Sequence, residues 1–351
     1  MRVVVKYDRA LVDDQGQVRG HDAGATLVRR LLRVFPGAQL IGNRPVLTAG
    51  VETIPLEFVD AESSVLINMD VIDSVAVWRV LRARCEKPRI MNFAWWNTSD
   101  FENTIERSEL ALSCALFPTF ANSERTATAL RDSIKRFVVT SLAEKSRVAW
   151  VNLGIRLEHA LPRQEPETPV VLYPAIYTSP VKQPRVFIDI VRKVARATPI
   201  RVEARLVSPD IISDVAMDLS RERWAKVSPL LPGRHEYWQA LSRTTAFLAT
   251  AKEESYGLEY IEALVAGAIG VFPDTHWAHA ILPEGYPFFY QTPAQAEQLL
   301  LRAVKDRDGC WAELDAVAGG SFRDWLADHH SDDAFEEAIT KRVAEWFSDA
   351  K

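Results

Sequence analysis

The sequence predicts an α/β protein with two domains, each built on a parallel sheet covered by helices. Its 351 residues exceed the usual size of one domain and favour two domains of about 150 to 180 residues each. In both halves, short apolar runs alternate with segments of helical periodicity, the pattern of parallel strands joined by helical crossovers. Residues 161–168, Leu-Pro-Arg-Gln-Glu-Pro-Glu-Thr, are polar and contain two prolines, and they indicate a linker between the halves.

The first domain is predicted to span residues 1–160. Apolar and β-branched runs indicate its strands, at 2–7, 39–41, 64–67, 89–93, 115–118 and 148–151. Segments with apolar residues on one helical face fall between them, at 25–34, 73–84 and 123–136. Ser123 begins the last of these segments and is a favourable N-cap residue.

The second domain is predicted to span residues 169–330, followed by a C-terminal segment at 331–351. Its strands are predicted at 170–173, 200–204, 246–250, 269–272 and 288–290. Its helices are predicted at 184–197, 209–220, 235–243, 257–266 and 293–305. In the last segment, residues 334–347 place Phe335, Ile339, Val343 and Phe347 on a common helical face, which predicts a final helix.

Composition excludes several classes of protein. Charged residues make up 25% and hydrophobic residues 48% of the chain, as in an ordinary globular protein. With a net charge of −5, the chain lacks the clustered positive charge that is typical of a dedicated nucleic-acid-binding protein. No apolar run reaches the roughly 18 residues of a membrane span, and residues 1–7 begin a strand rather than a signal peptide. These features predict a cytoplasmic protein without stable membrane insertion.

Cysteine and histidine usage predicts neither a disulfide framework nor a metal site. The three cysteines, Cys85, Cys114 and Cys310, are far apart and odd in number. The seven histidines show no His-x3-His or His-Glu-x2-His spacing, and the pairs His276/His279 and His329/His330 lack companion ligands. We therefore expect no metal and no cofactor.

The most informative segment lies at residues 254–262, Glu-Ser-Tyr-Gly-Leu-Glu-Tyr-Ile-Glu. It places Glu254 in a loop and Glu262 within the second turn of a helix that Gly257 opens. Two carboxylates can then face one ligand whose phosphate meets the helix N-terminus, an arrangement that suits a sugar nucleotide. Two glutamates also occur on many amphipathic helices, so the specificity comes from the apolar strand before the motif and the Ala-rich helix and strand after it.

The segment resembles the Glu-x7-Glu signature of retaining GT-B-fold glycosyltransferases, the broad family of sucrose synthase and glycogen synthase. Residues 152–156 and 121–126 resemble further short motifs of that family, in the same order along the chain. The resemblance implies two Rossmann-like domains facing a cleft, with the acceptor domain first and the nucleotide-sugar donor domain second. It also implies that the final helix packs back toward the N-terminal domain.

The resemblance assigns donor-side roles residue by residue. Glu254 would bind hydroxyls of the donor sugar, and Glu262 would bind the ribose. Lys182 matches a family lysine that contacts the diphosphate, whereas Tyr177 stands where the family has an arginine, and Arg185 is a candidate replacement. A surface lysine at a helix start is the alternative interpretation of Lys182. The remaining donor-binding candidates are Tyr256, Gly257 and Leu258.

Acceptor-side candidates come from two segments of the first domain. A glycine-containing loop follows the first strand, where a backbone can approach a ligand closely. The strand that ends in a histidine in many family members here ends in a tryptophan pair, which could form a stacking wall or belong to the protein core or an interface. The candidates are Gly20, His21, Asp22 and Gly24 of the loop, and Trp95 and Trp96 of the pair.

The predicted activity is the transfer of a hexosyl group from a nucleoside-diphosphate sugar to an acceptor hydroxyl, with retention and without a metal. The acceptor stays open among a glycan or small molecule, a protein and a hydroxymethylated DNA base. The chain is also similar to glycosyltransferases encoded by phages, for which phage DNA or a virion protein would be the acceptor. Two alternatives are a nucleotide-sugar-binding protein without transferase activity and a GT-B sugar-nucleotide epimerase.

Overall fold

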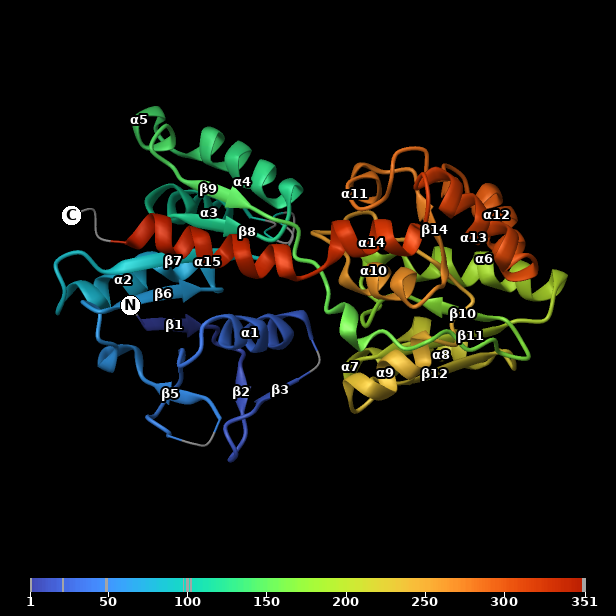
Figure 1. Ribbon diagram of the computed structural model, residues 1–351, viewed down its shortest axis with the longest axis horizontal. Helices are drawn as coiled ribbons and strands as arrows, with labels where there is room; N and C mark the ends of the chain where they lie inside the picture. Colours follow the sequence, from blue (N-terminus) through green and yellow to red (C-terminus); the bar gives the residue numbers. More distant parts are fainter. Residues whose placement is uncertain are drawn as a thin grey trace. The chain divides into compact units, whose positions relative to one another are not determined.

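The computed structural model describes residues 2–20, 22–47, 50–96, 98, 101 and 103–348. The chain forms two compact units, which we call unit 1 (residues 1–152 and 333–351) and unit 2 (residues 153–332) (Figure 1). The chain passes from unit 1 to unit 2 between residues 152 and 153, ahead of the predicted boundary at 160, and returns to unit 1 between residues 332 and 333. The predicted linker at 161–168 therefore lies within unit 2.

Unit 1 contains a seven-stranded sheet in which every neighbouring pair of strands is parallel. From one edge to the other, its strands are β5 (Glu52–Ile54), β4 (Gln39–Ile41), β1 (Arg2–Lys6), β6 (Ser64–Asn68), β7 (Arg89–Ala94), β8 (Thr119–Ala121) and β9 (Val148–Trp150). The central strands are buried on both faces, which explains their continuous apolar runs. A small antiparallel pair, β2 (Leu11–Val12) and β3 (Val18–Arg19), stands apart from this sheet.

Helices cover both faces of the unit 1 sheet. On one face, Leu66 and Ile90 form a core with the helix α2 (Ser74–Arg82). Further along this face, Ala94 and Ala121 pack against α3 (Thr104–Leu116) and α4 (Glu124–Phe137). On the opposite face lie α1 (Ala23–Val34) and the C-terminal helix α15 (Asp333–Phe347).

The C-terminal helix α15 is part of the core of unit 1. The ring of Phe335 lies 5.8 Å from that of Phe93 and 6.1 Å from that of Phe120, and the guanidinium of Arg30 lies 5.2 Å from its centroid. Arg33 of α1 forms an ion pair with Glu336 of α15. These contacts join the last residues of the chain to elements from its first 120 residues.

Unit 2 contains a six-stranded sheet, again parallel at every pairing. From edge to edge its strands are β12 (Ala225–Pro229), β11 (Arg201–Leu206), β10 (Val170–Tyr173), β13 (Ala246–Leu248), β14 (Ile269–Pro273) and β15 (Phe289–Tyr290). On one face, α6 (Pro184–Ala197) packs beside α12 (Pro293–Lys305), and Phe187 meets Tyr173 at 4.9 Å between ring centroids.

The other face of the unit 2 sheet has an aromatic core. Phe247 and Phe272 lie on neighbouring strands with their rings 5.3 Å apart, and Tyr260 of α10 (Leu258–Val265) packs on both. Trp277 of α11 (His276–His279) stacks on Tyr260 at 5.2 Å. Because Tyr260 follows Gly257 closely, this core anchors the first turn of α10.

Two predicted elements of the sequence were wrong. The predicted strand at 115–118 is the end of α3, because the apolar run of this helix continues to Leu116, and the strand β8 starts only after Pro118. The predicted helix at 209–220 is two short helices, α7 (Ser208–Ile211) and α8 (Asp214–Ser220), because the side chain of Ser213 caps the second one by accepting from Ala216 N.

The predicted pattern also missed several elements, among them β5 and β12 at the sheet edges and the helices α13 (Arg307–Val317) and α14 (Phe322–His330). Within the described ranges, no helix has both the length and the apolar character required to cross a bilayer.

Candidate active site

The unit 2 sheet changes direction between β10 and β13. From β10 the chain runs outward through β11 to β12, and it then returns to add β13 on the other side of β10. Ligands of open parallel sheets bind at such a switch point, beyond the carboxyl ends of the two strands. The segment after β10 carries Lys182, and the segment after β13 carries Glu254. The Thr250 hydroxyl donates to the Lys182 carbonyl at 2.7 Å and so joins the two segments.

Lys182 and Glu254 form an ion pair at this switch point. Tyr260 donates its hydroxyl to the same carboxylate oxygen, Glu254 Oε1, at 2.8 Å. The side chains of Lys182 and Glu254 are 21% and 11% exposed, so the pair is largely shielded from solvent. The structure thus brings together the two residues that the sequence predicted as catalytic, and it adds Tyr260.

The helix α10 begins directly beside this pair. Gly257 precedes it with a φ of 84°, in the left-handed region, and a Cβ added here would lie 2.5 Å from Cδ2 of Tyr260. Glycine is therefore required at this turn on both counts. The first backbone N–H groups of a helix have no partner within the helix, and its dipole favours anions there. Leu258 supplies the first of these groups, half-buried at the helix start.

Glu262 lies one turn further along α10 and is held from α9 (Arg234–Leu241). Arg234 Nη2 donates to its Oε1 at 2.6 Å, and the Tyr237 hydroxyl donates to its Oε2 at 2.7 Å. The Arg234 guanidinium also lies 5.1 Å from the Tyr237 ring centroid. Glu262 is 7% exposed. Burial lowers the pKa of Arg234, but the Glu262 carboxylate raises it by more. The pKa of Arg234 is therefore raised, and Arg234 stays charged.

Sequence reasoning missed Arg234 and Tyr237 as site residues. They are three residues apart on one helix and therefore lie on the same face. The predicted helix at 235–243 begins one residue too late, which left Arg234 outside it. The i, i+3 spacing of a cation and a tyrosine on this helix was the signal that could have found them.

Glu259 is a third carboxyl between the other two. Burial, and after it the charges of Glu254 and Glu262, raise its pKa to about 7, although the nearby Lys182 acts in the opposite direction. Burial also raises the pKa of Tyr237 and Tyr260 well above that of a free phenol. Both phenols therefore remain hydrogen-bond donors to their carboxylates at neutral pH.

The other donor-side candidates lie apart from this cluster. Tyr256 is buried, and its hydroxyl makes a 2.7 Å hydrogen bond with Nδ1 of His330, so its side chain belongs to the core. Arg185 is exposed in the first turn of α6, and its charge contributes to lowering the pKa of Asp218. Tyr177 is 43% exposed, and its carbonyl accepts from the Tyr173 hydroxyl at 2.9 Å.

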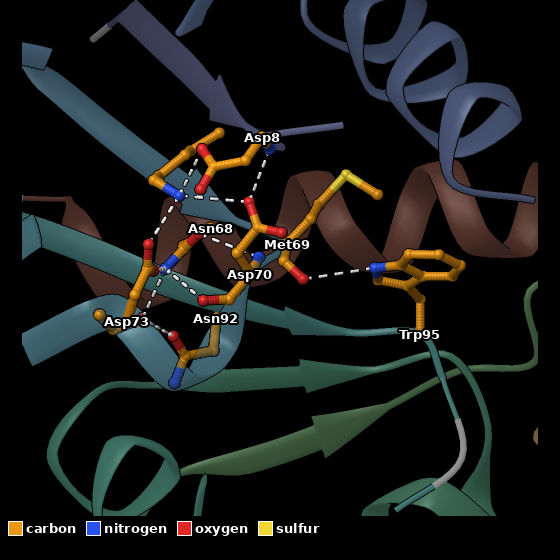
Figure 2. A network of polar contacts seen from close by, with 9 residues as sticks. Asp8, Asn68, Met69, Asp70, Asp73, Asn92 and Trp95 are labelled. Atoms are coloured by element: carbon orange, nitrogen blue, oxygen red, sulfur yellow. Dashed lines mark hydrogen bonds and ion pairs between the residues drawn. The ribbon is translucent and has the colours of Figure 1, made fainter. Parts of the chain in front are cut away.

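Unit 1 has its own switch point, between β1 and β6. Beyond the ends of these strands and of β7 lie Asp8, Asp70 and Trp95 (Figure 2). Lys6, with its side chain only 6% exposed, contacts Asp8 at 2.8 Å, Asp70 at 3.2 Å and Asp73 at 2.7 Å. Asn68 extends the network by donating to Asp73 at 2.8 Å.

The predicted tryptophan wall divides into two different environments. Trp95 donates Nε1 to the Met69 carbonyl at 3.3 Å (Figure 2). Its ring meets the Tyr7 ring edge-on at 5.8 Å. Trp96 packs against Phe101 at 4.8 Å and borders the core beneath α3 and α4. Trp95 thus stands at the switch point, whereas Trp96 belongs with the helices of that face.

The glycine-containing loop before α1 shapes the same edge of the sheet. A Cβ on Gly24 would lie 2.3 Å from the Tyr7 hydroxyl, so only glycine lets Tyr7 lie over α1. The carboxylate of Asp22 caps this helix by accepting from Ala25 N at 3.0 Å, and the Gly20 carbonyl accepts from Arg29 at 2.8 Å. His21, predicted as an acceptor-orienting group, lies outside the described residues.

In the part of the chain that the structure describes, no group of three or more His, Cys, Asp or Glu side chains could hold a metal ion. Positive charge at the unit 2 switch point comes instead from Lys182, from Arg234 and from the start of α10.

No family model and no curated protein sequence matches the chain. Solved structures do match over nearly its full length. Sucrose-phosphate synthase from Thermosynechococcus elongatus superposes with a TM-score of 0.71 at 11% identity, covering 99% of this chain and 100% of the other. HepE from Anabaena, in complex with UDP, gives 0.71 at 12% identity and covers 98% and 100%.

A UDP-forming α,α-trehalose-phosphate synthase from Burkholderia vietnamiensis is similar to the same degree. Its TM-score is 0.69 at 12% identity, with 97% of this chain and 96% of the other covered. Together with the two parallel sheets, these superpositions establish the fold. The chain has the GT-B fold of two Rossmann-like units, as its sequence predicted.

Proposed function

We propose that the protein is a glycosyltransferase that moves a sugar, with retention of configuration, from a nucleoside-diphosphate sugar to an acceptor hydroxyl. The observation that carries this proposal is the cluster of Lys182, Glu254 and Glu262 around the start of α10, at the switch point of the second sheet. Similar solved structures support it, since they include HepE in complex with UDP-glucose and a UDP-forming trehalose-phosphate synthase.

The donor nucleotide is proposed to lie across α10. Its diphosphate would meet the helix N-terminus and the Lys182 ammonium, the two positive features of the switch point. Its ribose would reach Glu262. A carboxylate offers about four acceptor positions, and Arg234 and Tyr237 use two of them, so capacity remains for two ribose hydroxyls.

The Lys182–Glu254 pair is proposed to exchange partners when the donor binds. A diphosphate carries more charge than one carboxylate and can displace Glu254 from the ammonium. Glu254, still fixed by Tyr260, then accepts hydrogen bonds from hydroxyls of the donor sugar. The ion pair would therefore hold both side chains in place until the donor diphosphate pairs with Lys182 and the donor sugar binds Glu254.

Sugar transfer then requires stabilisation of the leaving group. The bond between C1 of the sugar and the phosphate oxygen breaks, and the acceptor oxygen bonds to C1 on the same face while its proton passes to the departing phosphate. Negative charge grows on that phosphate, where Lys182 and the backbone N–H groups at the start of α10 are aimed. This scheme assigns the role of a metal ion to protein cations, and we propose that the reaction is metal-independent.

The acceptor is proposed to bind to unit 1. Its switch point offers the Trp95 ring and the Asp8 carboxylate, which is 63% exposed, for stacking and hydrogen bonding. The hydroxyl that this chemistry needs is present in each of the acceptor classes: a glycan or small molecule, a protein and a hydroxymethylated DNA base. For a phage protein, the acceptor would be a virion protein or phage DNA. The cytoplasmic location remains a prediction.

The proposal is tested by incubating the protein with UDP-glucose, GDP-mannose or ADP-glucose and each acceptor class, with and without EDTA. Release of nucleoside diphosphate reports transfer, and NMR of the product reports the anomeric configuration. Glu254→Ala should abolish turnover, while Glu262→Ala should mainly weaken donor binding. Glu284→Ala, at an exposed position of unit 2, is the matched control. Normal turnover by Glu254→Ala would show that the site is misassigned.

A nucleotide-sugar-binding protein without transfer is the second candidate. Tyr177 favours it, because this half-exposed phenol stands where the resembling family has an arginine on the diphosphate. Binding of a nucleotide sugar without release of nucleoside diphosphate for any acceptor class would select this alternative.

A further inference from the structure

Glu259 is placed where the donor diphosphate is proposed to bind. It is the second residue of α10, five residues after Glu254 and three before Glu262. Residues three apart on a helix lie on one face, so Glu259 and Glu262 share the face that the donor would contact. The Glu259 side chain is half-buried, and among the described residues none forms a hydrogen bond or ion pair with it.

Charged and titratable groups from several elements act on the Glu259 carboxyl. They are Lys182 after β10, Glu254 after β13, Glu262 and Tyr260 on α10, Tyr173 on β10 and Tyr237 on α9. Lys182, the cation of this set, pairs with Glu254, and Arg234 of α9 pairs with Glu262.

An ionised Glu259 would oppose the proposed donor. A diphosphate at the start of α10 would face a carboxylate held in the same shielded space, where like charges repel more strongly than in water. A neutral carboxyl has the opposite character, because its O–H is a hydrogen-bond donor. Burial and the two neighbouring glutamates raise the pKa of Glu259 to about 7, so the neutral form is accessible at physiological pH.

We propose that Glu259 also binds the donor: its side chain, as a neutral carboxylic acid, donates a hydrogen bond to a diphosphate oxygen. This inference rests on the proposed function of the site. Each donor molecule then binds only when the Glu259 carboxyl carries a proton. Glu259 is then a specificity-determining residue for the diphosphate, distinct from Glu254 and Glu262, which accept hydrogen bonds from hydroxyls.

The consequence is a donor affinity that falls at alkaline pH. Above its pKa the free protein has lost the Glu259 proton, and donor binding must take that proton up again. Between about pH 6 and about pH 8.5, the dissociation constant should therefore rise about 30-fold, approaching tenfold per pH unit at the alkaline end. A nucleotide sugar suits the test because its two phosphates do not titrate in this interval.

The experiment is isothermal titration of the full-length protein with UDP-glucose, GDP-mannose and ADP-glucose at several pH values, in two buffers of different ionisation enthalpy. For the nucleotide sugar that binds, wild type should take up close to one proton at about pH 8.5 and almost none at about pH 6. Glu259→Gln keeps a neutral donor of the same shape, and it should bind with the wild-type affinity of about pH 6 at every pH. Glu284→Gln should retain the wild-type slope.

Two results overturn the inference alone: a wild-type affinity that does not change with pH, or a Glu259→Gln variant that keeps the wild-type slope. Binding of none of the three nucleotide sugars at any pH would instead remove the proposed function and this inference with it. Comparison of the urea-unfolding midpoints of wild type and Glu259→Gln at about pH 6 verifies that the variant is folded.

Discussion

Each of the two sheets places a lysine beside carboxylates at its switch point. The two lysines differ in their exposure and in the carboxylates that pair with them. In unit 1, Lys6 is 6% exposed and faces three carboxylates, those of Asp8, Asp70 and Asp73. In unit 2, the Lys182 side chain is 21% exposed and forms an ion pair with Glu254. The first ammonium is enclosed by three carboxylates, whereas the second is more exposed, and we propose that it exchanges Glu254 for a phosphate of the donor.

The difference follows from where each lysine lies in the fold. Lys6 is the last residue of the central strand β1, and hydrogen bonds with Asp73 and Asp8, with the charge of Asp70, outweigh burial and raise its pKa. Lys182 ends the short 3-10 helix Pro180–Lys182 outside the sheet. A lysine at a switch point is therefore not by itself a sign of phosphate binding. The exposed fraction of the lysine side chain and the carboxylates that pair with it decide whether a phosphate can bind.

The largest predicted effect tests the structural role of Lys6. Lys6→Met removes a buried ammonium from three partly exposed carboxylates, and the free energy of unfolding should fall by about 3 kcal/mol. Lys182→Met is the comparison and should lose less, about 2 kcal/mol or below, because Tyr260 still donates a hydrogen bond to Glu254, the carboxylate that this change leaves without its cation. Urea unfolding measures both. Equal losses would remove the distinction between the two lysines.

The next effect tests the catalytic role of Lys182. Lys182→Ala removes the cation that we propose stabilises the leaving phosphate, and kcat should fall about 10²- to 10³-fold while the fold is retained. Lys182→Arg keeps the charge and should recover part of the rate. Steady-state kinetics with saturating donor measures this, and a kcat within about twofold of wild type for Lys182→Ala would contradict it.

The pH response should also separate the two regions. His330 of unit 2 is buried, and burial lowers its pKa to about 4. The folded state then binds this proton more weakly than the unfolded state, so the contribution of His330 to stability is present above about pH 6.5 and is lost as pH falls toward 4. The pKa of Lys6 in unit 1 is raised, so its contribution is lost only in alkali.

His330→Gln can keep both hydrogen bonds of His330, with Tyr256 and with the Ile281 carbonyl, without titrating. On acidification from about pH 7 to about pH 4, wild type should lose up to about 3 kcal/mol of unfolding free energy relative to this variant. Parallel urea unfolding at the two pH values measures the difference. A constant gap between the two proteins would show that His330 does not titrate as its burial requires.

The smallest predicted effect concerns the support of Glu262. Tyr237→Phe removes one donor to this carboxylate and leaves the Arg234 contact in place. The variant should lose about 1 kcal/mol of stability, and its dissociation constant for the donor should rise a few-fold because Glu262 is less well fixed. Denaturation and calorimetry measure the two changes. A tighter donor complex would show that Tyr237 competes with the ribose for Glu262.

Much of the fold and the core of the site could be predicted from the sequence. The period of the apolar runs indicated two parallel sheets, and the spacing of Glu254 and Glu262 around Gly257 located the start of α10. Lys182 was predicted through the resemblance of its segment to the retaining GT-B glycosyltransferases. These features are local, because each depends on residues close together in the chain.

The partners of these residues could not be predicted, because they come from elements distant in the sequence. Glu262 is held by α9, and Lys6 collects carboxylates from the segments after two strands that are neighbours only in the sheet. Tyr256 was predicted to bind the donor on its place in the motif, yet its ring turns into the core to meet His330. The apolar run at 115–118 was ambiguous because it is too short to distinguish a strand from a helix end.

The central claim is that the unit 2 switch point, and not the lysine cluster of unit 1, binds the nucleotide sugar. The most direct test is a calorimetric titration of wild type and Lys182→Ala. The titrant is the nucleotide sugar, among UDP-glucose, GDP-mannose and ADP-glucose, that binds to wild type. The account predicts that the dissociation constant rises about 10- to 100-fold in Lys182→Ala, as expected for the loss of a charged hydrogen bond. An unchanged dissociation constant in this variant would contradict it.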